Sequence, residues 1–134
     1  MKKILTTILL TFLLTTISFA DERADTHAKL TKCTASIMIL ATLAPENSKY
    51  QQTAIQAAIF LANVTDAYEA KYFPELTEDD KDRIAKEDLD TIYQEVKSLE
   101  GNLEALQKYW ADNIEECKVL GVTTARELEK ANAN

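Results

Sequence analysis

The chain has 134 residues, 22 acidic and 15 basic, and a formal net charge of −7 at pH 7. This acidic balance argues against nucleic acid or an anionic membrane surface as a partner, since both are negatively charged. Only two glycines and two prolines occur, and Ala, Leu, Glu and Lys dominate between them. That composition predicts an all-α fold.

The first 20 residues have the pattern of a secretory signal peptide. Two lysines follow Met1, an apolar run extends over residues 4–19, and small residues, Ser18 and Ala20, stand at −3 and −1 of the expected cleavage point. An uncleaved anchor is the weaker alternative, because the run is short for a span of ~20 residues. The basic start is typical of bacterial exported proteins, so we expect a periplasmic or secreted protein.

Cleavage would leave residues 21–134 as one helical domain of 114 residues. It removes two lysines and no acid, so 15 basic residues become 13 against 22 acidic ones, a net charge of −9. We expect no membrane contact after cleavage. A cationic partner is compatible with this charge, although a solvated acidic surface is its commoner meaning.

The first mature helix is predicted to begin at an N-cap, Asp25 or Thr26, and to end before Pro45. Its apolar residues recur at the three- and four-residue spacing of one helix face: Leu30, Cys33, Ile37, Leu40 and Ala44. Further apolar residues make its second half apolar nearly all round, which indicates neighbours on several sides.

The second helix is predicted over residues 49–72, after a capping box of Ser48 and Gln51 and before Pro74. Thr77 caps the third helix, with Glu78, Asp79 and Asp80 in its first turn, where negative charge suits the helix dipole. The apolar stripes of these two helices contain Tyr50, Ala54, Ala57, Leu61, Val64 and Tyr68, then Ile84, Ala85, Leu89, Ile92, Val96 and Leu99.

Residues 103–120 form a fourth apolar stripe that we expect to end at Gly121, with a short last helix starting at Thr124. The stripe keeps its phase across Gly101 and Asn102, so residues 78–120 could be one long helix or two in a hairpin. Periodicity alone leaves both open.

The two cysteines decide between these topologies. With a reversal at Gly101, a rise of ~1.5 Å per residue brings Cys33 and Cys117 to within about 5 Å in height, whereas one long helix separates them by about 40 Å. A disulfide needs Cα atoms within ~7 Å and is favoured in an exported protein. We therefore predict a Cys33–Cys117 disulfide and an all-α, up-down-up-down four-helix bundle with a short C-terminal helix.

The chain lacks the residues of the common catalytic sites. His27 is the only histidine and is interpreted as a surface residue. With His27 as the only histidine we expect no serine or cysteine triad and no ordinary zinc site, and a Cys33–Cys117 bridge leaves no thiol nucleophile. Haem is disfavoured because no second axial ligand is offered. We expect no metal, no cofactor and no enzymatic activity.

The candidate partner-binding residues are acids and aromatics near helix ends: Glu78, Asp79, Asp80, Asp82, Tyr72, Phe73 and Tyr109. The acids also suit a helix N-terminus, and the aromatics also suit packing at the end of a bundle. Export, the acidic surface and the missing catalytic groups favour a non-catalytic protein-binding role: an inhibitor or immunity-like protein, or a small chaperone. The alternative is a small-ligand or metal carrier within the bundle. The sequence indicates neither the partner nor an oligomeric state.

Overall fold

The computed structural model describes the backbone of residues 2–134 and the side chains of residues 19–134. It contains four helices: α1 (Lys2–Leu43), α2 (Lys49–Tyr72), α3 (Glu78–Ser98) and α4 (Leu103–Asn132). The described residues form no strand, so the all-α prediction is confirmed. Within residues 19–134 no helix carries a stretch long and apolar enough to cross a membrane. Most of the predicted signal peptide, residues 1–20, lies outside the residues whose side chains are described.

The helix boundaries in the middle of the chain follow the predicted caps. The Ser48 hydroxyl accepts a hydrogen bond from the N–H of Gln51 at 3.0 Å, and α2 begins at the next residue, Lys49. Thr77 caps α3 in the same way and forms a complete capping box with Asp80. Gly101 has a φ of +87°, a left-handed conformation that glycine adopts without strain. The predicted reversal at this residue is confirmed.

The start of the first helix differs from the prediction. Neither Asp25 nor Thr26 is a cap, because α1 runs through both. The sequence up to Ala44 contains no glycine or proline that would interrupt a helix. The expected cleavage point therefore lies inside α1, between the exposed residues Ala20 and Asp21.

The predicted end of the fourth helix at Gly121 is wrong, and so is the separate helix from Thr124, because α4 continues to Asn132. The reason is packing. A Cβ atom at residue 121 would lie 3.0 Å from Leu61 Cδ2 and 3.0 Å from Phe60 Cε1. The glycine therefore lets α4 pass close to α2.

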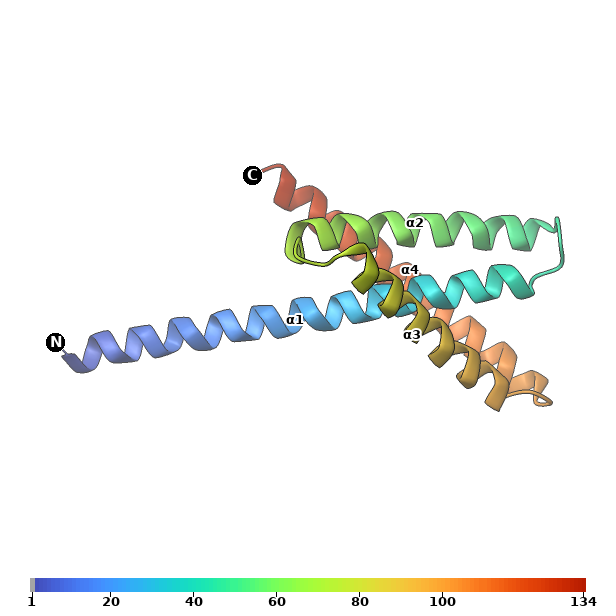
Figure 1. Cartoon of the computed structure of the whole chain (residues 1–134), viewed down its shortest axis with the longest axis horizontal. Helices are drawn as coiled ribbons and strands as arrows, with labels where there is room; N and C mark the ends of the chain where they lie inside the picture. The colour runs from blue at the N-terminus through green and yellow to red at the C-terminus, as the bar shows by residue number, and fades with distance from the viewer. Residues whose placement is uncertain (1) are drawn as a thin grey trace.

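The helices form two antiparallel pairs that cross obliquely (Figure 1). α1 and α2 form one hairpin, and the turn at Gly101 joins α3 and α4 into the other. α3 packs against α1 from one side, whereas α4 packs against both α1 and α2 from the other. α1 thus lies between α3 on one side and α4 on the other.

Two apolar clusters fill the junctions between the helices. One joins α1, α2 and the C-terminal half of α4, and its buried residues are Leu30, Val64, Tyr68 and Leu128. The other surrounds the disulfide, and its buried residues are Ile37, Leu40, Leu61 and Cys117. Most of these residues belong to the predicted apolar stripes; Leu128 belongs to the continuation of α4 beyond Gly121.

Candidate functional site

His27 is buried against α2, which corrects its interpretation as a surface residue. Its side chain is only 11% exposed, and its Nε2 lies 2.8 Å from Oε1 of Glu69, whose side chain is 5% exposed. The Phe73 ring stacks on the imidazole with the two centroids 4.8 Å apart. Because α1 continues through residues 25–27, His27 lies one turn before Leu30 on the face that meets α2.

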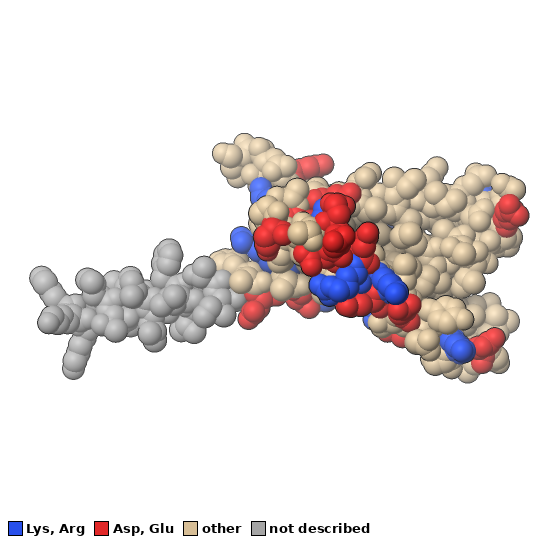
Figure 2. All heavy atoms as spheres, viewed as in Figure 1, with Lys and Arg blue, Asp and Glu red and all other residues tan. Residues whose placement is uncertain are grey.

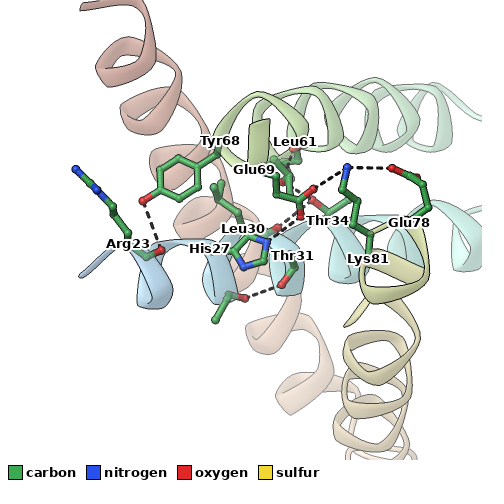
Figure 3. Close-up of polar contacts among 12 residues, drawn as sticks. Arg23, His27, Leu30, Thr31, Thr34, Leu61, Tyr68, Glu69, Glu78 and Lys81 are labelled. Atoms are coloured by element: carbon green, nitrogen blue, oxygen red, sulfur yellow. Dashed lines mark hydrogen bonds and ion pairs between the residues drawn. The ribbon is translucent and has the colours of Figure 1, made fainter. Parts of the chain in front are cut away.

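The pair extends to α3 through Lys81. Its ammonium group lies 3.5 Å from the second carboxylate oxygen of Glu69 and 3.2 Å from Oε1 of Glu78. Figure 3 shows these side chains converging from three helices, with Glu69 between His27 and Lys81. We call His27, Glu69 and Lys81 the buried triad after its two buried members, His27 and Glu69; the Lys81 side chain is 31% exposed. It fixes the first turn of α3 against α1 and α2.

The predicted acidic residues lie next to this triad. Glu78, Asp79 and Asp82 are exposed, as is Glu75 in the turn before α3. These four residues are called the acidic surface from here on. Figure 2 shows acidic side chains gathered over the turn between α2 and α3 and the start of α3.

Within the acidic surface, only Glu78 forms an ion pair with a described basic side chain. Among the described side chains, no lysine or arginine lies within ion-pair distance of Glu75, Asp79 or Asp82. The nearby Arg83 instead pairs with Asp80 and Glu87. Three carboxylates of the acidic surface are therefore free to meet an external cation.

Asp80, the fourth predicted acid, has a structural role. Its carboxylate accepts hydrogen bonds from the hydroxyl of Thr77 at 2.8 Å and from the backbone N–H of Thr77 at 3.2 Å. These hydrogen bonds hold the pKa of the Asp80 carboxyl below its ordinary value. Its charge is engaged in capping α3.

The predicted aromatic residues divide between two places. Tyr72 and Phe73 are half-buried and pack against the cluster of Leu30 and Val64. The guanidinium of Arg23 lies 4.4 Å from the centre of the Tyr72 ring. Both rings therefore serve the packing of α2 against α1, close to the buried triad.

Tyr109 lies in a separate cluster that joins α1, α3 and α4. Its hydroxyl donates to Glu95 at 2.8 Å, and Lys32 donates to the other oxygen of the same carboxylate at 2.9 Å. Burial and the hydrogen bond to Glu95 raise the pKa of Tyr109 above its ordinary value. Burial opposes ionisation of Glu95, but the hydrogen bonds from Lys32 and Tyr109 outweigh it and lower the pKa of that carboxyl. Tyr109 is thus not part of the acidic surface.

The predicted disulfide joins α1 to α4, with the Cα atoms of Cys33 and Cys117 5.4 Å apart. The described part of the chain contains no free cysteine. An open groove of about 640 Å³ runs beside the bridge between the two helices. Charged, polar and apolar side chains line it, including Lys29, Lys32, Asn113, Glu116 and Leu120.

The described residues contain no group of three or more His, Cys, Asp or Glu side chains placed to hold a metal ion. Comparison with protein-family models, curated proteins and solved structures finds no match to this chain.

The sequence prediction missed the buried triad, although the pattern contained a signal for it. His27 stands three residues before Leu30, in phase with the apolar stripe of the first helix. Glu69 stands seven residues after Ala62, in phase with an apolar face of the second helix. A single histidine and a single carboxylate, each continuing an apolar stripe, indicate a buried pair because neither is stable there without a partner.

Proposed function

We propose that the protein is an exported, non-catalytic protein-binding protein whose acidic surface binds a cationic region of another protein. An inhibitor, an immunity-like protein and a small chaperone are the roles in this class. The observation that carries the proposal is the set of three exposed carboxylates, Glu75, Asp79 and Asp82, none of which forms an ion pair with a basic side chain of the described residues.

The packing around these carboxylates supports such a role. The buried triad ties the first turn of α3 to α1 and α2, so the backbone that carries Asp79 and Asp82 is held before a partner arrives. A pre-ordered surface loses less entropy on binding than a flexible one. Opposite charge on the partner also accelerates association and favours the correct orientation.

Export and the bundle architecture complete this proposal. The signal-peptide pattern of residues 1–20 and a disulfide between Cys33 and Cys117 support a periplasmic or secreted location. We propose an up-down-up-down order for the four helices, supported by the two short turns and the reversal at Gly101.

The test is capture of a partner from the exported proteins of the host. The bait is the wild type or an Asp79→Asn/Asp82→Asn variant. The matched control is Glu127→Gln/Glu129→Gln, which removes two exposed carboxylates from α4. We expect wild type and control to retain the same basic protein at ~0.05 M salt and release it at ~1 M, where the screening length is about 3 Å.

The Asp79→Asn/Asp82→Asn variant should retain much less of that protein. Equal recovery by this variant and by the wild type would contradict the role of the acidic surface. Recovery of no basic protein by the wild type at low salt would contradict the proposal as a whole.

The second candidate function is carriage of a small ligand, favoured by the open groove of about 640 Å³ beside the disulfide. This volume lies within the ~300–1,000 Å³ of typical ligand sites. Native mass spectrometry of the protein purified from its own host should then show added mass that a Leu120→Trp substitution in the groove removes. A spectrum of the unliganded mass alone would reject this function.

A further inference from the structure

The end of the α1–α2 hairpin nearest its connecting turn carries almost no charge. Residues 33–45 and 50–65 contain no Asp, Glu, Lys, Arg or His, although 28% of the chain is charged. In Figure 2 this end, at the right, is largely tan, whereas red and blue side chains gather near the middle of the molecule. The charged and uncharged residues thus occupy different parts of the surface.

One side of this uncharged end is apolar and lies open. Met38, Ile55 and Ile59 are 48%, 43% and 56% exposed. Together with three alanines they line a shallow groove of about 370 Å³, to which only α1 and α2 contribute. We call this set the apolar face: Met38, Ala41, Ile55, Ala58, Ile59 and Ala62.

The apolar face contains three small residues beside three large, half-exposed ones. Ala58 and Ala62 lie one turn apart on α2, and with Ala41 of α1 they form the base of the groove. The half-exposed side chain of Ile59 lies beside these alanines. A two-fold axis through the face would place Ile59 of each copy over the alanines of the other, as a same-patch interface requires. Small residues at the contact also let helix axes approach closely.

The distribution of charge selects the occupant. Two copies of a chain with net charge −7 repel each other, and a contact through an uncharged end keeps their carboxylates apart. A cationic partner would find no acidic residue within this groove. An anionic lipid surface favours a helix with lysines and arginines beside its apolar residues, and residues 50–65 contain neither.

The exposed apolar area of the face is of the size that a small dimer interface needs. A large apolar side chain presents on the order of 200 Å², so Met38, Ile55 and Ile59 together leave about 300 Å² in water. A small specific interface covers about 600 Å² per subunit, of which a little over half is apolar. The three alanines of the face add to this apolar part.

We propose that the apolar face is a homodimer interface, in which the α1–α2 hairpins of two copies pack against each other about a two-fold axis. The interface lies on α1 and α2 and leaves the acidic surface at the start of α3 free. The proposal is independent of the proposed function, because the two use different residues.

Sedimentation velocity of the protein, in the form that its host produces, tests this proposal. The variant is Ile59→Asp, which would place two carboxylates near the axis. The matched control is Val119→Asp on α4, since Val119 is 55% exposed and lies outside the apolar face. We expect a dimer mass for wild type and control at ~10–100 µM. The dissociation constant of the Ile59→Asp dimer should be at least tenfold larger.

Far-UV circular dichroism checks that each variant keeps its helices, and Met38→Lys on α1 replaces Ile59→Asp if that variant unfolds. A monomeric wild type at ~100 µM overturns the proposal. So does an equal dissociation constant for Ile59→Asp and Val119→Asp. Binding of a monomeric wild type to phosphatidylglycerol vesicles would overturn it too, and would assign the face to a lipid.

Discussion

Replacing Glu69 by alanine should destabilise the protein strongly, because both oxygens of this carboxylate are engaged. The substitution leaves His27, with an 11% exposed side chain, without its acceptor, and removes one of two carboxylates from Lys81. A buried polar group without a partner costs about 1–3 kcal/mol, and breaking a buried charge pair costs about 3–5 kcal/mol. Lys81 is 31% exposed and can turn to solvent, so we expect a loss of about 3 kcal/mol.

Asp25→Ala is the matched control. Asp25 pairs with Lys29 at 2.7 Å, but both side chains are more than 60% exposed. Ion pairs in such surroundings contribute about 0–1 kcal/mol. We expect this variant to unfold within about 0.5 kcal/mol of the wild type.

The measurement is urea unfolding followed by circular dichroism, with the disulfide intact in every sample. For a small domain the free energy falls by about 1–3 kcal/mol per molar urea, so a loss of 3 kcal/mol moves the midpoint by about 1–3 M. A Glu69→Ala midpoint equal to that of Asp25→Ala would refute the assignment of Glu69 to a buried, fully engaged position.

Two further predictions concern the disulfide and the α3–α4 contact. The Cys33–Cys117 bridge spans a sequence separation of 84 residues. Reducing it should lower the free energy of unfolding by about 4–5 kcal/mol in the chain-entropy model. Urea unfolding with and without dithiothreitol measures this difference, and a value below about 1 kcal/mol would contradict the prediction. Tyr109 has a pKa above its ordinary 10.0 in the folded state because of burial and its hydrogen bond to Glu95. Its stabilising contribution is therefore complete below pH 10 and is lost as the pH rises further, since the unfolded chain then releases the proton more readily. Tyr109→Phe should make the fall in stability between about pH 9 and 11 shallower than in the wild type; parallel curves would contradict this.

The sequence predicts the helices where local signals and tertiary packing agree. Pro45, Pro74 and the caps at Ser48 and Thr77 act within one turn, so they locate α2 and the start of α3 correctly. The disulfide adds the one long-range constraint that periodicity lacks. It selects the reversal at Gly101 over a continuous helix.

The same local rules fail where a distant contact decides. Gly121 has the residue type of a helix end, but its role is the close approach of α4 to Leu61 and Phe60, more than fifty residues away in sequence. His27 likewise receives its partner from α2. The exposed acids at the start of α3 can be predicted, because the local sequence alone places charged residues in the first turn of a helix. The crossing of the two hairpins cannot, because it depends on side-chain shapes that a one-dimensional pattern does not contain.

The bridge between α1 and α4 also determines how the molecule carries mechanical load. A force applied to the two chain ends passes through the disulfide and bypasses the residues between Cys33 and Cys117, which include all of α2 and α3. At ~3.4 Å per extended residue, the sequence separation of 84 residues withholds about 290 Å of chain from extension. Two members of the buried triad, Glu69 and Lys81, lie inside this protected loop. α2 and α3 can therefore remain folded together while the ends of α1 and α4 are stretched.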